Sequence, residues 1–456
     1  MSHIQFPYRR ESTRRQHSSP DNGDFVTGSS HNDSMTCEPA ARAAGAAPPA
    51  GTTTGPAPSP ALLEALAGRR PARTPVWFMR QAGRSLPEYR ALRARAGVPM
   101  LDACLDPALA AEVTLQPVRR HGVDAAVFFS DIMVPLRLAG LAVRIEPGLG
   151  PVLDEPVRTP ADVARLTARR YGEGEAGGAG ARAVEAGVRA ACAELGTPTA
   201  PGGGANLGER PLAGLAASRG SASWTPLIGF GGAPFTLAAY LVEGRASRDH
   251  LAARTLMHAD PGAWDALMTW CARLTGDFIA AQVRAGASAA QLFDSWAGSL
   301  SPADYRARVA PYSALALSIA RRAVSPTTGA PAPLIHFGTG TARLLADMRA
   351  AGADAVGVDD RTDLAEAIAV LDGAGPGPCP VQGNLDPALL AAPWEVLAPA
   401  VDACLEAGRA APAHVVNLGH GVPPTTDPDV LTRLVARVHG SADWEATALA
   451  GWEAAA

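Results

Sequence analysis

Short runs of apolar and β-branched residues recur along the chain, and most are followed by a longer stretch with helical periodicity. The runs lack the apolar–polar alternation of a half-exposed strand, which is typical of strands buried on both faces of a sheet. Eight such runs are present: Val76–Met79, Ala126–Phe129, Leu227–Phe230, Ala290–Phe293, Leu334–Phe337, Ala355–Val358, Pro380–Gln382 and Val415–Leu418. The stretches that predict helices are Leu237–Leu251, Gly262–Ala285, Ala303–Arg322, Thr341–Ala351, Leu364–Leu371, Trp394–Ala407 and Pro428–Val438. Eight strands that alternate with helices predict an α/β fold, a closed (β/α)8 TIM barrel.

The starts of several helices are marked by a capping residue followed by proline. Asp260-Pro261, Ser301-Pro302 and Asp427-Pro428 each place a side-chain acceptor at the N-cap and a proline at the first helical position. The alternative fold is an open doubly wound sheet, which favours a G-x-G-x-x-G sequence after its first strand. Here the first strand is followed by RQAGR (80–84) instead.

Composition divides the chain into one folded domain and several segments without periodicity. Residues 1–58 are rich in Ser, Thr, Asn, Gly, Ala and Pro, and we expect them to be a disordered N-terminal extension. Met35 lies inside this extension, so one hypothesis is that the true start is Met35. The barrel should span 59–440, with flexible insertions at 172–180 and 197–223, followed by a tail at 441–456.

The charged residues exclude several reaction classes. All 40 cationic side chains are Arg, so a Schiff-base aldolase, a pyridoxal-phosphate enzyme or a P-loop NTPase is excluded in its ordinary form. The net charge of −4 does not suggest nucleic acid or an anionic membrane as partner.

No apolar run is long enough for a membrane span, and the first residues lack a signal sequence. The six Cys and ten His lack metal-site spacing, so we expect a cytoplasmic protein with free thiols and no metal.

The carboxyl ends of barrel strands carry the chemistry in this fold, and here they are crowded with polar residues and glycine. They supply Arg80 and Arg84 after the first strand, Asp131 after the second, Tyr240 in the helix after the third, Ser295 after the fourth and His420 after the eighth. Two Arg at one strand end imply an anionic substrate. Asp131 could contact a substrate, or it could have a structural role as a helix cap or as a partner of Arg84. His420 lies between two Gly that would let a substrate approach it. Gly338-Thr339-Gly340 fits either an anion-binding turn or a tight βα turn.

Longer segments of the chain resemble one enzyme family. PVWFMRQAGRSLPEYR (75–90) and IGFGGAPFTLAAYLVEG (228–244) are similar to the two signature segments of the uroporphyrinogen decarboxylase family. FFSDIMVP (128–135), LFDSWAGSLSP (292–302), VQGNLDP (381–387) and NLGHGVPPTTDP (417–428) resemble further blocks of that family, in its order. The resemblance covers about residues 60 to 440.

This resemblance implies a barrel that is usually a homodimer and that uses neither metal nor organic cofactor. It implies a carboxy-lyase that converts the four acetate side chains of uroporphyrinogen III to methyls, giving coproporphyrinogen III and CO2 in haem biosynthesis. The family's substrate-binding loop falls on Arg80, Gln81, Ala82, Gly83 and Arg84, and its other substrate-side residues fall on Arg93, Asp131, Tyr240, Ser295 and His420. Catalytic roles are implied for Asp131, Arg80, His420 and Tyr240.

The chain departs from the family pattern at two places. The family usually has an aromatic residue after RQAGR, where this chain has Ser85, which would loosen the packing near the loop. The insertion at 197–223 precedes the third strand and should therefore lie at the amino end of the barrel, away from the cleft.

The chemistry implied by the resemblance needs an electron sink for the loss of CO2. Protonation of the pyrrole carbon beside the acetate makes the ring cationic, and a fixed carboxylate at Asp131 would stabilise that charge. Arginines would hold the carboxylates of the substrate. The proton donor stays open: the family mapping suggests Arg80, but arginine's ordinary pKa makes it a poor acid near neutrality, and His420 or Tyr240 is the alternative.

Two other functions remain open. Cobamide-linked methyltransferases share this barrel but bind zinc through His-x-Cys and a distant Cys, whereas His336-Phe337-Gly338 lacks the Cys. A non-catalytic tetrapyrrole-binding protein would keep the arginines without needing Asp131.

Overall fold

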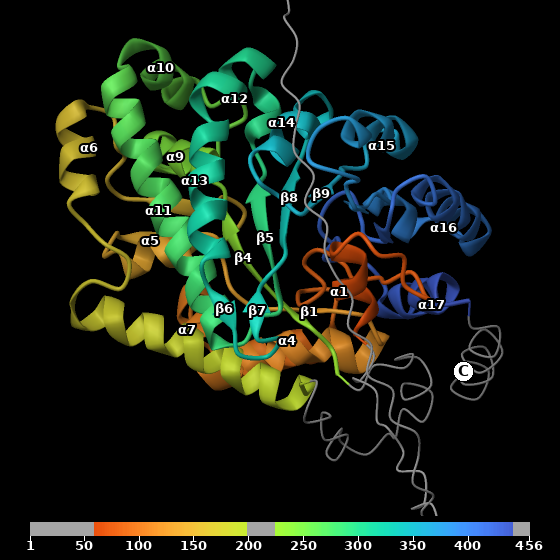
Figure 1. Ribbon diagram of the computed structural model, residues 1–456. Coiled ribbons are helices and arrows are strands. Elements are labelled where there is room, and N and C mark those ends of the chain that lie inside the picture. The colour runs from red at the N-terminus through yellow and green to blue at the C-terminus, as the bar shows by residue number, and fades with distance from the viewer. Residues whose placement is uncertain (1–58, 198–223, 441–456) are drawn as a thin grey trace, which may run out of the picture. The chain divides into compact units, whose positions relative to one another are not determined.

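A computed structural model of the chain describes residues 59–197 and 224–440. Seven parallel strands form its main sheet, in the order β1-β4-β5-β8-β9-β10-β11, surrounded by helices (Figure 1). The strands are β1 (Ala126–Val127), β4 (Leu227–Gly232), β5 (Ala289–Asp294), β8 (Leu334–Gly338), β9 (Ala355–Gly357), β10 (Val381–Gln382) and β11 (His414–Val415). Seven of the eight predicted strands are therefore confirmed, and their order follows the chain.

The predicted first strand is reduced to a single bridge, yet it closes the barrel. Val76 pairs in parallel with Val416, just after β11. On this side the amide of Val416 donates to the carbonyl of Pro75 at 2.9 Å, and on the other side the amide of Asp124, just before β1, donates to the carbonyl of Val76 at 2.8 Å. The segment thus lies between the first and last strands of the sheet, and the fold is a closed (β/α)8 barrel.

Most barrel helices begin where the sequence predicts, but two predicted helices are split. Asp260, Ser301 and Asp427 accept from the amides of Ala263, Asp304 and Asp429 as N-caps. The predicted helix Leu237–Leu251 is two helices separated by a loop at 244–250, and Ala303–Arg322 is split at Val309. The helices that follow the strands are α5 (Val134–Leu138), α9 (Pro234–Glu243), α10 (Leu251–Ala259), α11 (Pro261–Ala285), α12 (Pro302–Arg308), α13 (Ala310–Arg321), α14 (Leu345–Ala350), α15 (Leu364–Asp372), α16 (Trp394–Gly408) and α17 (Pro428–Val438).

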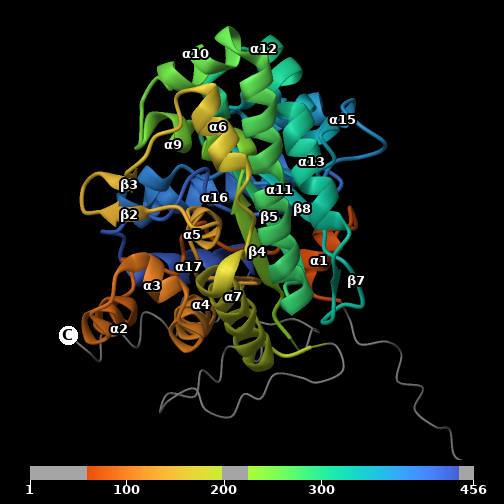
Figure 2. The same ribbon diagram turned by 90° about the vertical axis from the view of Figure 1, so that its left-hand side faces the viewer.

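The remaining helices lie before, between and after the strands of the barrel along the chain. They are α1 (Ala61–Leu66), α2 (Pro87–Ala96), α3 (Met100–Cys104), α4 (Pro107–His121), α6 (Pro160–Thr167), α7 (Gly174–Leu195) and the 3-10 helices η1 (Ala297–Ser299), η2 (Ala342–Leu344) and η3 (Pro387–Ala391). Two short antiparallel ribbons, β2–β3 (Val143–Glu146 and Gly150–Leu153) and β6–β7 (Val324–Ser325 and Ala330–Pro331), were not predicted. Figure 2 shows the β2–β3 ribbon to one side of the parallel sheet.

The structure differs from the expected flexible insertion at 172–180, because α7 already begins at Gly174. Gly177 and Gly180 of this helix are buried against the end of α5. A Cβ at Gly177 would lie 2.6 Å from the carbonyl oxygen of Leu138. Glycine here allows close helix packing rather than a loop. The other expected segments, 1–58, 198–223 and 441–456, lie outside the described residues.

The interior of the barrel holds a polar layer with an aromatic layer above it. The Nε1 of Trp77 donates to Gln382 Oε1 at 3.1 Å, and Gln382 Nε2 donates to Gln291 Oε1 at 2.9 Å. Because β9 and β8 separate β10 from β5 in the sheet, the second bond crosses the interior. Phe293 lies two residues after Gln291 and so shares its face.

The aromatic layer lies toward the carboxyl end of the strands. Phe293 contacts Phe230 and Phe337 edge-on, with ring centroids 5.4 and 6.0 Å apart. These three rings come from the neighbouring strands β4, β5 and β8. They form an apolar floor beneath the strand ends on that side of the barrel.

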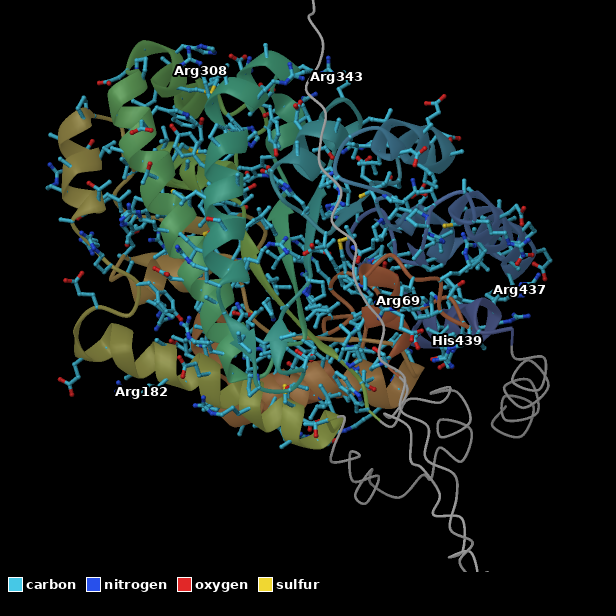
Figure 3. The ribbon with its side chains drawn as sticks, viewed as in Figure 1. Arg69, Arg182, Arg308, Arg343, Arg437 and His439 are labelled. Atoms are coloured by element: carbon cyan, nitrogen blue, oxygen red, sulfur yellow. The ribbon has the colours of Figure 1, made fainter. Side chains whose placement is uncertain are left out.

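Charged pairs join the outer helices and the amino end of the barrel. Arg437 of α17 bonds Asp402 of α16 through Nε at 2.9 Å, and Figure 3 shows Arg437 and His439 near the end of α17. His439 Nε2 lies 2.8 Å from Asp124 Oδ2, and Asp124 also forms an ion pair with Arg73. These contacts hold the last helix against the seam between the first strand and β1.

None of the helices in the described ranges is long and apolar enough to cross a membrane.

Candidate active site

Arg80 ends the first strand in a left-handed backbone conformation, with φ of 59°. Its side chain lies against Gly421 in the loop after β11: a Cβ at Gly421 would be 2.6 Å from Arg80 Cδ. The amide of Val422 donates to the Met79 carbonyl at 2.9 Å and holds this loop in place. The glycine after His420 therefore makes room for Arg80, whereas the sequence suggested room for a substrate.

Asp131 follows β1 and performs one of the two structural roles considered for it, that of a cap. Its Oδ1 accepts from the Met133 amide at 2.8 Å, so it caps the turn before α5. Burial raises the pKa of the Asp131 carboxyl above its ordinary value, while the Met133 amide and the charge of Arg80 act in the opposite direction. Its cationic neighbour is thus Arg80, where the sequence suggested Arg84.

Tyr240 lies in α9, where the charges of Asp131 and Arg80 both act on its phenol. Burial, and next the negative charge of Asp131, raise the pKa of the Tyr240 phenol to about 12, and Arg80 opposes them. The phenol therefore keeps its proton near neutrality and can donate a hydrogen bond.

His420, after β11, is the fourth member of this group. Partial burial lowers the pKa of its imidazole, and the charge of Arg80 lowers it further, while Asp360 acts in the opposite direction. The imidazole is therefore mainly neutral at pH 7. Arg80 acts on Asp131, Tyr240 and His420 alike, so the structure brings four of the predicted residues into one electrostatic cluster.

Ser295 joins this cluster through its neighbour in the chain. Its carbonyl accepts from Thr339 Oγ1 at 2.6 Å, which fixes the loop after β5. The next residue, Trp296, packs against Tyr240 with ring centroids 4.0 Å apart and the ring planes tilted by 35°. Ser295 is half-buried beside this pair.

Gln81, Ala82 and Gly83 form the turn between the two predicted arginines. Gln81 is fully buried: its Oε1 accepts from the Phe78 amide at 3.0 Å, and its Nε2 donates to the Ala125 carbonyl at 2.9 Å. Gly83 makes room for a close approach, since a Cβ there would lie 3.1 Å from the Arg80 carbonyl oxygen. The Gln81 side chain therefore holds the turn against β1 and points its amide at the protein backbone.

The side chains of Arg84 and Arg93 line a cavity of about 540 Å³, together with Tyr89, Arg90 and Pro424. Arg90 Nη1 donates to the carbonyls of Arg84 and Ser85 at 2.7 and 3.1 Å, and Arg93 Nη2 donates to the Val98 carbonyl at 2.8 Å. Within the described ranges no carboxylate forms an ion pair with any of the three guanidinium groups. The cavity therefore favours an anion.

Arg90 was missed by the sequence analysis, although a signal was present. It lies three residues before Arg93 in α2, so both side chains project from one face of that helix. The cavity is also close to the Asp131 strand end. Tyr89 packs edge-on against Phe129 with ring centroids 5.9 Å apart, and Phe129 lies two residues before Asp131.

The anion at the Gly338-Thr339-Gly340 turn is the carboxylate of Asp359, a side chain of the protein itself. The Gly340 amide donates to Asp359 Oδ2 at 2.6 Å, and Thr362 Oγ1 donates to Asp359 Oδ1 at 2.6 Å. Arg361 pairs with the same carboxylate at 3.1 Å. The turn therefore binds a carboxylate of its own chain, which ties the loop after β8 to the loop after β9.

His336 was relevant to the methyltransferase alternative, and it faces the helices rather than the barrel interior. Its Nε2 lies 3.5 Å from Asp294 Oδ2, and both side chains are fully buried. Over residues 59–197 and 224–440, no three His, Cys, Asp or Glu side chains are grouped as a metal site would require.

Comparison with known proteins gives a consistent family. The sequence model of the family "Uroporphyrinogen decarboxylase" matches residues 57–196 and 217–441. A uroporphyrinogen decarboxylase of Arthrobacter sp. (strain FB24) is 55% identical over 378 residues, which are 83% of this chain and 96% of that protein. Another, of Leifsonia xyli subsp. xyli (strain CTCB07), is 56% identical over 388 residues, covering 83% of this chain and 94% of that protein.

A solved structure shows the same fold at much lower sequence identity. A methyltransferase from Methanosarcina mazei superposes with a TM-score of 0.60 at 18% identity, over 83% of this chain and 96% of that one. At this identity the likeness concerns the fold alone.

Proposed function

Because the chain belongs to the uroporphyrinogen decarboxylase family, we propose that the cluster of Arg80, Asp131, Tyr240 and His420 is where its reaction takes place. The chain is a carboxy-lyase of tetrapyrrole biosynthesis, and the reaction is the decarboxylation of uroporphyrinogen. The acetates become methyls and CO2 is released, which turns uroporphyrinogen III into coproporphyrinogen III. The observation that carries the assignment is the placement of Arg80: its side chain lies against Gly421, next to His420, and its charge also acts on Asp131 and Tyr240.

Asp131 would stabilise the cation that forms on the substrate. Protonation of the pyrrole carbon beside an acetate makes the ring positive, and the electrons of the breaking C–CO2 bond then flow into it. The methylene that remains takes up a proton to become the methyl, and the ring carbon loses the proton it gained, so each acetate consumes one proton and releases one CO2. The carboxylate of Asp131 accepts hydrogen bonds from pyrrole N–H groups and opposes their positive charge in a partly desolvated place. Its raised pKa supports this role, because a substrate cation restores the stabilisation that burial has removed.

His420 is our choice for the proton donor. The Tyr240 phenol, with a pKa of about 12, holds its proton too tightly to release it readily near neutrality. Burial and the charge of Arg80 disfavour protonated His420, so its imidazolium is scarce but gives up its proton easily. Tyr240 then serves as a hydrogen-bond donor to the substrate, and Arg80 as a partner for the carboxylate of the reacting acetate.

The cavity lined by Arg84, Arg90 and Arg93 would hold carboxylates that do not react. Uroporphyrinogen carries eight carboxylates, so most of its charge lies away from the reacting acetate. Guanidinium groups without an acidic partner bind carboxylates without first breaking an ion pair. We assign this cavity to orientation of the macrocycle.

The decisive experiment is anaerobic incubation of the protein with uroporphyrinogen III, followed by chromatography of the oxidised products. We expect porphyrins with seven, six, five and finally four carboxylates, without added metal or cofactor. Binding of uroporphyrinogen without any loss of carboxylates would instead identify a carrier protein. Activity that depends on zinc and a cobamide would support the methyltransferase alternative.

We further propose that the enzyme works as a homodimer in the cytoplasm, as the family resemblance implies. Light scattering of the purified chain tests the dimer, since a monomer at assay concentrations would contradict it. Fractionation of the cells tests the location.

A further inference from the structure

A buried histidine lies beside an exposed leucine at the start of α10. His250 is 3% exposed, whereas Leu251 is 64% exposed. The two residues before them, Arg248 and Asp249, are also exposed. Burial of leucine stabilises a fold and burial of an imidazole usually does not, so this arrangement is the reverse of the one that hydrophobicity favours.

The backbone at His250 carries a further cost. Its φ and ψ are 52° and 38°, the left-handed region, which is unfavourable for an L-residue with a side chain. This conformation turns the ring inward and leaves Leu251 outside. A strained residue that persists in a fold is a reason to look for a role.

Capping and hydrogen bonding do not account for the inward ring. His250 occupies the N-cap position, but Glu243 Oε1 accepts from the amides of Ala252 and Ala253 at 2.9 and 3.2 Å in its place. Neither ring nitrogen of His250 makes a hydrogen bond of good geometry within the described ranges, and the backbone of Arg248 contributes only a weak one. Burial lowers the pKa of the imidazole, so the ring is neutral and behaves as a flat, mainly apolar plate.

The inward ring of His250 makes two aromatic contacts. The ring lies edge-on to Trp296 with centroids 4.4 Å apart, and it stacks on Phe235 with centroids 6.1 Å apart. Trp296 in turn packs against Tyr240 with ring centroids 4.0 Å apart. The indole is therefore held between His250, from the loop before α10, and Tyr240, from α9.

We propose that His250 is a positioning residue, which holds Trp296 in place and thereby fixes the Tyr240 hydroxyl and the Ser295 loop. This inference rests on the proposed function of Tyr240 and on the family resemblance, which places Ser295 on the substrate side. Histidine suits the position because it tolerates the left-handed region better than most residues with a large side chain, and because its ring is flat. Without the ring, Trp296 can tilt away from Tyr240, and the phenol loses its fixed direction.

The test is a double-mutant cycle between His250 and Tyr240. We expect His250→Ala to lower kcat by about tenfold or more with KM within about twofold, because a misplaced group acts mainly on the reacting state. In a Tyr240→Phe background the same change should cost about twofold or less, because the two residues act through one contact. His250→Phe keeps a ring against Trp296 and should restore most of kcat.

Met257→Ala provides the matched control. Met257 is a fully buried residue of the same helix, and no aromatic contact of His250 involves it. It should lower the melting temperature at least as much as His250→Ala while leaving kcat nearly unchanged. An equal loss of kcat in the control would overturn the proposal. The same loss from His250→Ala in both Tyr240 backgrounds would also overturn it when Tyr240→Phe by itself lowers kcat.

A failure of the proposed function would look different. If Tyr240→Phe alone leaves kcat unchanged, the role assigned to Tyr240 is wrong. Positioning through Trp296 toward Ser295 would then still be supported if His250→Ala lowers kcat in the parent enzyme but not in Trp296→Ala. If His250→Ala leaves kcat unchanged in the parent, the inference about His250 fails by itself.

Discussion

Two aspartates lie at the opposite ends of β1, and their surroundings differ. Asp124, before the strand, accepts from the Val76 amide at 2.8 Å, lies 2.8 Å from His439 Nε2 and forms an ion pair with Arg73. Asp131, after the strand, accepts a single hydrogen bond within the described ranges, from the Met133 amide. The carboxylate of Asp124 thus has three partners within the protein, whereas the carboxylate of Asp131 has one hydrogen-bond partner and can accept further hydrogen bonds.

This difference shows how a barrel separates stability from chemistry. A carboxylate that already has three partners stabilises the seam of the barrel and has little capacity for a ligand. A carboxylate with one amide partner, raised in pKa by burial, gains most when a cationic or N–H-bearing ligand arrives. Substitutions at each end should therefore affect different measurements.

The largest expected effect is on turnover at the carboxyl end. Asp131→Ala should remove nearly all activity, and Asp131→Asn should lower kcat by about 10²–10³-fold, because a fixed charge that faces the developing cation is lost. Steady-state assays with uroporphyrinogen and a circular dichroism spectrum of each variant measure this. Activity within a few fold of the parent would end the central role of Asp131.

The matching change at the amino end should affect stability. Asp124→Asn weakens the pairs with Arg73 and His439, and we expect a loss of about 3 kcal/mol in the free energy of unfolding. Below its melting transition the variant should keep kcat, because Asp124 lies at the far end of β1 from the reaction. Chemical denaturation and activity assays on the same sample compare the two. A loss of kcat without loss of stability would break the contrast.

The carboxyl end should itself divide into a reacting part and an orienting part. Arg84→Ala or Arg93→Ala removes one guanidinium from the cavity, and we expect KM to rise by about tenfold with kcat changed much less, since such contacts serve ground state and transition state alike. Raising the salt concentration should reduce the difference between variant and parent. Arg343→Ala, on η2, is a control that should leave KM unchanged. A fall in kcat without a rise in KM would place these arginines in the reacting part.

The smallest effect concerns stability against pH. Burial raises the pKa of Asp131 in the folded state, so its proton is held more tightly folded than unfolded. The stabilisation from this proton is complete below the unfolded pKa and is lost as pH rises through the folded pKa. At pH 7.5 Asp131→Asn should therefore melt at the parent temperature or about 1–4 °C above it, and this advantage should vanish in acid. Thermal melts from pH 4 to 8 show the trend, and a variant that is less stable at pH 7.5 would contradict it.

The pattern of apolar runs predicted seven of the strands, and the capping pairs at Asp260, Ser301 and Asp427 marked helix starts correctly. Such features are local, since they depend on periodicity and on a few neighbouring residues. The first strand was predicted as an ordinary strand, but only Val76 forms a bridge. The expected loop at 172–180 is helical from Gly174, because glycine was interpreted as a breaker where it permits close packing against Leu138.

Candidate site residues were proposed from their place at strand ends and from the family resemblance, neither of which reveals the contacts that each side chain makes. Gln81 turns its amide to the backbone, and the glycines around Thr339 bind Asp359 of the same chain. Arg90 escaped notice because one more arginine on a helix is not informative until the cavity is known.

The sequence by itself determined the alternation of strands and helices, the family, and which residue types stand at the strand ends. Only the tertiary structure decided that the charge of Arg80 acts on Asp131, Tyr240 and His420 together. It also decided that Asp124 has more partners than Asp131, and that His250 turns inward while Leu251 stays exposed. The physical reason is that periodicity and caps arise from neighbours in the chain. The partners of a charge or of a strained residue come from segments far away, and closure of the barrel brings them together.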